Sequence, residues 1–191
     1  MQLDEYISKA CLTESNDFGQ ISWRFNKRAI RLLHGVMGLV TETVELSAAM
    51  AKLDRTNIAE EYGDHMWYVA VVCDELGVTQ NDFSNHPYSS RATMHEIEGD
   101  MMDALKRHLF YGAPLDVGLL RGSILDICHN LFDAMLALDL NPYSVMEGNI
   151  AKLQARYPDR FNQHDAVSRN LEAERAILES HDADTARQDE N

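Results

Sequence analysis

Proline, cysteine and basic side chains are all scarce in this sequence, and each shortage excludes a class of protein. Only 4 prolines occur among 191 residues, and few segments alternate β-branched with polar residues, which argues against a β-rich fold. Several long stretches instead carry apolar residues three and four positions apart. Such spacing places the apolar side chains on one face of a helix, so we predict an all-α protein.

The 3 cysteines, Cys11, Cys73 and Cys128, are an odd number and show no CxxC spacing. Because two of them fall inside apolar helical stretches, we expect reduced thiols, no disulfide and a cytoplasmic location. The N-terminus lacks the basic segment followed by an apolar run that marks an export signal, and no apolar run approaches the roughly 20 residues that span a bilayer. We therefore expect no contact with a membrane.

Acidic side chains outnumber basic ones by 31 to 17, which gives the chain a formal net charge of −14. A surface of this sign repels the phosphates of DNA and RNA, so we expect no nucleic-acid partner. A small anion could still bind through a metal ion. Apolar residues make up 45% of the chain, which is enough for a real core.

The expected organisation is one domain at residues 1–180, followed by a flexible tail at residues 181–191 that has no apolar periodicity. Two tandem helical hairpins, at residues 23–77 and 92–140, are expected to form a four-helix-bundle core. Further helices precede this core and follow it at residues 142–180.

Individual helix ends are predicted from capping residues. Asn57 is the expected N-cap of the third helix, Gly77 its C-terminal stop, and Pro142 the first residue of the sixth. The predicted helices cover residues 2–12, 23–53, 57–77, 92–110, 116–138, 142–156 and 165–179.

Two acid pairs stand on consecutive predicted helices, Glu42 with Glu45 and Glu61 with Asp64. Residues three apart lie on the same helical face, so each pair points in one direction. If the two helices pack antiparallel through these faces, four carboxylates meet, and like charges so close repel unless a cation lies between them. Mg²⁺ is the natural occupant, because it takes oxygen ligands and commonly bridges to substrate phosphates.

The second hairpin looks like a degraded copy of the first. A shift of 55 positions aligns the first helices of the two hairpins, and a shift of 62 aligns their second helices. Two of the four acid positions have lost their carboxylates, so this hairpin is predicted to pack against the first without a metal site. Chance similarity of two amphipathic hairpins is the alternative. The alignment pairs Glu42 with Ile97, Glu45 with Asp100, Glu61 with Ser123 and Asp64 with Asp126.

Both acid pairs resemble the motifs of the all-α nucleoside triphosphate pyrophosphohydrolases, the MazG-like superfamily that also includes dimeric dUTPases and phosphoribosyl-ATP pyrophosphohydrolases. Its pattern is ExxE followed by ExxD, here at residues 42–45 and 61–64, with Gly-Leu before the first motif and Trp-Tyr after the second. Residues 149–158 are similar to the segment that follows the catalytic hairpin in many phage and bacterial members. The chain departs from simpler members at residues 80–140, which separate the ExxD motif from that segment.

The resemblance implies hydrolysis of a (deoxy)nucleoside triphosphate between its α- and β-phosphates, giving a monophosphate and pyrophosphate in control of the nucleotide pool. It implies Mg²⁺ as cofactor, with Mn²⁺ as a substitute, and Glu42, Glu45, Glu61 and Asp64 as metal ligands and catalytic residues. Metal ions neutralise phosphate charge and lower the pKa of a bound water. One of the glutamates could act as base instead, and the sequence leaves open which one.

Two states of assembly are compatible with the sequence. The family resemblance favours a homo-oligomer, a dimer or larger. A chain that carries both hairpins could instead be a monomeric pseudo-dimer. If the chain is a phage protein, the cytoplasm where it works is that of the host.

Basic side chains are expected to hold the oxygens of the triphosphate. Lys152 and Arg156 lie four apart on one predicted helical face, with Asn149 beside them. Lys52, one helical face along from Glu45, is the second choice. Ion pairs with surface acids are the alternative role for each of these bases.

Further candidates for contact with substrate lie near the acids. His34 precedes Glu42 by eight positions and Tyr68 follows Asp64 by four, although either could be purely structural. Trp67 could stack on a base, but aromatic residues in such helices more often fill the core, and we expect this role.

Small residues fall near the face of the first acid pair. They are Gly35, Gly38 and Ala49. We expect them to leave open space beside the carboxylates and so to form a pocket.

There are two alternatives to this enzyme. A carboxylate-bridged di-iron bundle requires Glu-x-x-His on two helices, and the chain contains no such motif. A non-catalytic nucleotide-sensing or helical interaction module derived from the same fold is the stronger rival. Retention of all four acids argues against it, because a structural helix gains nothing from clustering unpaired charge.

Overall fold

The structure is a computed structural model that describes residues 1–88, 92–158, 160–168 and 170–189, with side chains up to residue 180. Within these ranges the chain folds into ten α-helices without a β-strand, which confirms the all-α prediction. No helix in the described part combines the length and the apolar character needed to cross a bilayer. The helices are α1 (Leu3–Cys11), α2 (Phe18–Arg24), α3 (Lys27–Lys52), α4 (Arg55–Leu76), α5 (Gln80–Asn85), α6 (Met94–Tyr111), α7 (Val117–Ala137), α8 (Pro142–Arg156), α9 (Gln163–Val167) and α10 (Leu171–Asp189).

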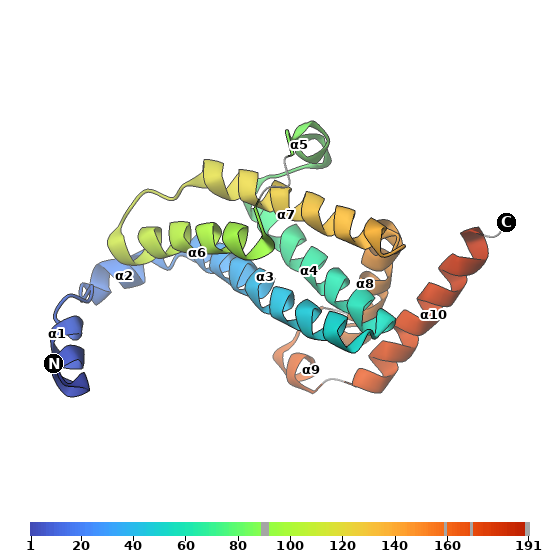
Figure 1. The fold of residues 1–191 in the computed structure, drawn as a ribbon, viewed down its shortest axis with the longest axis horizontal. Coiled ribbons are helices and arrows are strands. Elements are labelled where there is room, and N and C mark those ends of the chain that lie inside the picture. The colour runs from blue at the N-terminus through green and yellow to red at the C-terminus, as the bar shows by residue number, and fades with distance from the viewer. Residues whose placement is uncertain (89–91, 159, 169, 190–191) are drawn as a thin grey trace.

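Four long helices form the bundle that positions the site (Figure 1). α3 and α4 make the first hairpin, and α6 and α7 make the second; α3 packs against α6, and α4 packs against α7. The apolar faces of all four helices share one core, which includes Leu32, Leu39, Leu105, Ile124 and Met135. The chain therefore forms the predicted pair of packed hairpins.

The long helix expected at residues 23–53 is two helices in the structure. α2 ends at Arg24, and α3 begins at Lys27 because the Asn26 side chain accepts a hydrogen bond from Ala29 N at 3.0 Å. A cap of this kind satisfies one of the backbone N–H groups that a first helical turn leaves free. The prediction of one continuous helix is wrong at this point, because the apolar spacing runs through the break.

The turn between α3 and α4 places the two acid-bearing helices side by side. Leu53 takes a left-handed backbone with φ of 55°, and Asp54 caps α4 by accepting a hydrogen bond from Asn57 N at 3.2 Å. The cap is therefore Asp54 and not Asn57 as predicted, since either residue type suits the position. Gly77 ends α4 as predicted, with φ of 64°.

α5 is a short helix that the apolar spacing does not predict, because six residues are too few to show a helical period. The Thr79 side chain and the Asp82 side chain cap each other's backbone at its start. Asp82 also pairs with Arg121 of α7 at 3.0 Å, and the Phe83 ring stacks on His129 of α7 with centroids 4.0 Å apart. These contacts fix α5 against the second hairpin.

The C-terminal helices differ from the prediction in their boundaries. The helix expected at residues 165–179 is split into α9 and α10. α10 continues to Asp189, so most of the tail expected at residues 181–191 is helical, and residues 190–191 lie outside the described part. A helical backbone can extend in this way because it satisfies its own hydrogen bonds without an apolar face.

Candidate active site

Three of the four predicted acids converge where α3 and α4 lie side by side. Glu42 and Glu45 come from α3 and Glu61 from α4, and one carboxylate oxygen from each lies within 4.8 Å of the other two. Glu42 and Glu61 are buried, each with 8% of its surface exposed, whereas Glu45 faces solvent. The antiparallel packing predicted from the spacing of the acids therefore brings them together.

The two buried glutamates of the cluster, Glu42 and Glu61, have raised pKa values. Burial, reinforced by the charges of Asp64, Glu45 and Glu61, raises the pKa of Glu42 from 4.5 to about 8. Burial also raises the pKa of Glu61 to about 7, with Glu45, Asp64 and Glu60 adding to the effect. A cation between the oxygens would remove this repulsion. An all-carboxylate donor set suits a hard ion such as Mg²⁺, so the residues present fit the expected cofactor.

The fourth acid, Asp64, is held by α8. Lys152 Nζ donates to the two Asp64 oxygens at 2.8 and 2.7 Å and to Glu60 Oε1 at 3.1 Å, and Asn149 Nδ2 donates to Asp64 Oδ1 at 2.7 Å. Gly63 permits this approach, because a Cβ there would lie 2.9 Å from the Cβ of Asn149. Although the second hairpin intervenes in sequence, α8 brings Asn149 and the fully buried Lys152 to the acids as expected.

Two of the expected basic residues are not brought to the acids. Arg156 instead pairs with Glu174 of α10, through Nε at 2.9 Å and Nη2 at 2.5 Å. The polar face of α10 gave no sign in the sequence that it would supply a partner for Arg156. Lys52 is exposed at the end of α3, seven residues beyond Glu45 and so about 10 Å away along the helix axis.

An aromatic cluster lies next to the acids on the same two helices. The His34 ring is 5.6 Å from Tyr68 and 6.2 Å from Trp67, and the two aromatic rings are 4.9 Å apart. Burial, and after it the charges of Glu42, Asp64 and Glu45, raise the pKa of Tyr68. Trp67 is 36% exposed, so the expectation of a core role is wrong: its ring packs on His34 and Tyr68, and part of its surface faces solvent.

The small residues on α3 serve close helix packing and not an open pocket. A Cβ at Gly38 would lie 2.1 Å from the Tyr68 ring, and a Cβ at Gly35 would lie 2.5 Å from a methyl of Val72. Ala49 is also buried, at 1% exposure. The expectation that these residues leave space beside the acids is wrong, because α4 side chains fill it.

The second hairpin gathers no comparable acid cluster among its described side chains. Ile97 is buried in the core, Ser123 is half-buried, and Asp100 is exposed. Asp126 is hydrogen-bonded to His86 Nε2 at 2.8 Å. The positions aligned with the four acids are thus used for packing and for holding the connection between the hairpins.

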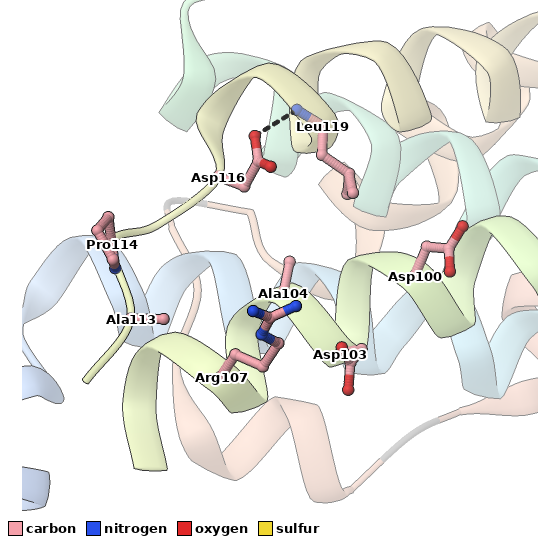
Figure 2. A pocket seen from close by; sticks show the side chains of 8 residues that line it. All are labelled: Asp100, Asp103, Ala104, Arg107, Ala113, Pro114, Asp116 and Leu119. Carbon is pink, nitrogen blue, oxygen red and sulfur yellow. Dashed lines mark hydrogen bonds between the residues drawn. The ribbon is translucent and has the colours of Figure 1, made fainter. Parts of the chain in front are cut away.

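A surface hollow of about 390 Å³ lies on the second hairpin, away from the acid cluster. Figure 2 shows Asp100, Asp103 and Arg107 along α6, and Asp116 at the start of α7 accepting a hydrogen bond from the backbone of Leu119. Its charged groups are exposed, Asp116 already caps α7 and Asp103 already pairs with Lys106, so it is a weaker candidate than the acid cluster.

Sequence reasoning missed a set of buried polar residues directly behind the acids. Thr43 follows Glu42 and His65 follows Asp64, and both contact Glu98 of α6. All three side chains are buried. Only the positions of Thr43 and His65 beside predicted ligands could have drawn attention to them.

A comparison with known families matches the segment that carries the acids. Residues 34–85 match the model of the MazG nucleotide pyrophosphohydrolase domain. The match is consistent with the MazG-like superfamily. The MazG-like segment contains all four acids and spans most of α3, all of α4 and α5, and it indicates a hydrolase of acid anhydrides with a nucleotide substrate. No curated protein and no solved structure matches the chain.

Proposed function

We propose that the chain is a Mg²⁺-dependent pyrophosphohydrolase that converts a (deoxy)nucleoside triphosphate to the monophosphate and pyrophosphate, and so takes part in control of the nucleotide pool. The observation that carries the proposal is the convergence of Glu42, Glu45 and Glu61 within a MazG-like segment. Glu42 and Glu61 are buried, and neither forms an ion pair with a basic side chain within the described part of the chain. Burial of an unpaired carboxylate is unfavourable unless a cation binds to it.

In this proposal Glu42, Glu45 and Glu61 hold the cation, with Asp64 at the edge of the site. When bound, Mg²⁺ would offset the charge of the phosphates and lower the pKa of a coordinated water. One of these three glutamates could act as base instead of as a ligand and accept the proton of the attacking water. Mn²⁺ is expected to replace Mg²⁺, because both take oxygen ligands.

The side chains around the acids would bind the rest of the substrate. Lys152 and Asn149 donate to Asp64 at 2.7 Å, and all three hydrogens of the Lys152 ammonium are taken by Asp64 and Glu60. In this proposal a phosphate oxygen displaces one of these contacts when the nucleotide binds. The cluster of His34 and Tyr68, with the exposed face of Trp67, offers aromatic surface for the nucleoside. Arg156 and Lys52 have no part in this proposal.

The test is to incubate the protein with Mg²⁺ and each common NTP and dNTP, and to measure pyrophosphate and monophosphate. Pyrophosphate is expected, with no release of single phosphates. Asp64→Asn should lower kcat/KM on the order of a hundred-fold, the usual loss when one group that stabilises transition-state charge is removed. Asp126→Asn is the matched control, since this aligned aspartate lies in the second hairpin, and it should leave turnover nearly unchanged.

Other results would point elsewhere. Nucleotide binding without hydrolysis of any substrate would favour the nucleotide-sensing module. Full residual activity of Glu61→Gln would contradict the assignment of the site, because the change keeps the shape of the side chain and removes its charge. Equal losses for Asp64→Asn and Asp126→Asn would mean that the second hairpin holds a functional site of its own.

The assembly that we propose is a homo-oligomer. Ile30, Met37 and Val44 are seven positions apart on α3, and each is at least half exposed. Apolar residues at this spacing form a stripe that suits packing against another helix. We call these three residues the α3 stripe. A monomeric pseudo-dimer is the alternative.

A further inference from the structure

We infer that Glu98 of α6 is a positioning residue for the acid cluster: it ties α3 to α4 directly behind the metal ligands. The second hairpin would then complete the centre indirectly, without donating a ligand. This inference rests on the proposed function only in so far as Glu42, Glu45 and Glu61 bind a divalent cation.

The tie consists of three buried side chains from three helices. Glu98 has 1% of its surface exposed, and its Oε1 accepts a hydrogen bond from Thr43 Oγ1. His65 Nε2 lies 3.2 Å from Thr43 Oγ1 and 3.7 Å from Glu98 Oε1, and His65 has no exposed surface. Thr43 adjoins Glu42 on α3, and His65 adjoins Asp64 on α4. A movement of α3 or α4 relative to α6 would therefore displace an acid of the site and, with it, a member of the tie.

The direction of the hydrogen bonds follows from the chemistry of the groups. A carboxylate only accepts, so the single hydroxyl hydrogen of Thr43 goes to Glu98. The Thr43 oxygen must then accept from His65, which places the imidazole hydrogen on Nε2. With the hydrogen on Nε2, His65 Nδ1 carries only a lone pair, and it has no hydrogen-bond partner among the described residues. The chain of donors therefore runs from α4 through α3 to α6.

A carboxylate buried at position 98 lowers the stability of the fold. Glu98 Oε2 has no hydrogen bond within the described part of the chain, and His95 Nδ1 lies 3.6 Å from it. The same face of α6 is otherwise apolar, with Ile97, Met101 and Leu105 buried. Burying an incompletely satisfied polar group destabilises a fold, so packing alone would favour another apolar residue here. Holding Thr43 and His65 in register explains the carboxylate.

The experiment measures the affinity for Mn²⁺ without nucleotide, by electron paramagnetic resonance, in wild type, Thr43→Val, Glu98→Met and Glu98→Gln. Loss of a group that orients metal ligands typically weakens binding about ten- to a hundred-fold, and we expect this for Thr43→Val and Glu98→Met. Glu98→Gln keeps an oxygen that can accept from Thr43 and should lose less. Combining Thr43→Val with Glu98→Met should add little to either change alone, because both remove one interaction. Asp100→Asn, an exposed change on the same helix, is the control and should bind as wild type does.

The outcomes separate this inference from the proposed function. Unchanged Mn²⁺ affinity in Thr43→Val and Glu98→Met, with or without a loss of thermal stability, would show a merely structural role and overturn the inference while leaving the proposed function intact. Weaker Mn²⁺ binding in these variants supports the inference even if wild type hydrolyses no nucleotide. If wild type binds no Mn²⁺, the inference fails. Should Glu98→Met not fold, Thr43→Val decides, since valine has the shape of threonine and removes only the hydroxyl.

Discussion

Glu42 and Glu61 give the free energy of unfolding a dependence on pH that is unusual for carboxyl groups. Their pKa values rise from 4.5 to about 8 and about 7 on folding, so between these values the folded chain binds more protons than the unfolded chain. Stability contributed by these groups is therefore full below pH 4.5 and is lost as pH rises through the folded pKa values.

We expect the metal-free protein in EDTA to melt at a lower temperature at pH 8 than at pH 6, measured by thermal unfolding. Mg²⁺ should raise the melting temperature more at pH 8, because protons compete with the ion at pH 6. Glu61→Gln serves as the control: it removes one of the two titrations and should flatten the pH dependence. A melting temperature that rises from pH 6 to pH 8 in EDTA would contradict this account.

At the scale of helices, the spacing of α3 and α4 depends on Gly38. A Cβ there would meet the Tyr68 ring at 2.1 Å, so Gly38→Ala must push the helices apart. We expect a loss of about 1–3 kcal/mol in the free energy of unfolding, the usual effect of overpacking. Urea denaturation measures the loss, and Mn²⁺ affinity should fall with it.

The matched control for this change is Gly99→Ala on α6. A Cβ at Gly99 would meet no atom within 4 Å, so the change should stabilise the protein by up to about 1 kcal/mol, the difference in helix propensity between the two residues. If both variants gained stability, the contact between Gly38 and Tyr68 would not set the distance between the helices.

α8 carries two basic residues with separate roles, one turn apart. Lys152→Met should lower kcat/KM on the order of a hundred-fold, because the donors on Asp64 and on phosphate are lost. Arg156→Met should leave kcat/KM near that of wild type and cost about 3 kcal/mol in the free energy of unfolding, because it breaks the buried pair with Glu174. Steady-state kinetics and urea denaturation together distinguish the two. A large kinetic effect of Arg156→Met would restore it as a substrate-binding residue.

The sequence predicts those features of the helices that depend on local spacing. Residues three apart share a helical face wherever the helix lies, so the convergence of Glu42 with Glu45 is predictable from the chain alone. The partner of Arg156 is not, because it depends on how α10 folds back onto α8. The exposure of Trp67 is not predictable for a similar reason: helical spacing gives the direction of the side chain on its helix but not which element lies opposite. The role of Glu98 is not predictable either, because its contacts with Thr43 and His65 form only where α6 packs against α3.

For the whole molecule, the exposed α3 stripe predicts self-association. Ile30, Met37 and Val44 are 51%, 53% and 60% exposed, so a second copy could bury them. Light scattering coupled to gel filtration should find a dimer or larger, and Met37→Glu should shift it toward the monomer, since a carboxylate in an apolar seam is unfavourable. Phe110→Glu on α6, also exposed, is the control and should leave the mass unchanged. A monomeric wild type would favour the pseudo-dimer.

The contact between Thr43 and Glu98 has a consequence for symmetry. Under the 55-residue shift these are equivalent positions of the two hairpins, and in the structure they touch. An assembly of two identical hairpins about a two-fold axis would set such a position against its own copy. Two threonines would lose the carboxylate acceptor, and two glutamates would repel each other. When both hairpins belong to one polypeptide, the two positions can carry different residues. Thr43 and Glu98 can then form a complementary donor–acceptor pair at the position of the axis.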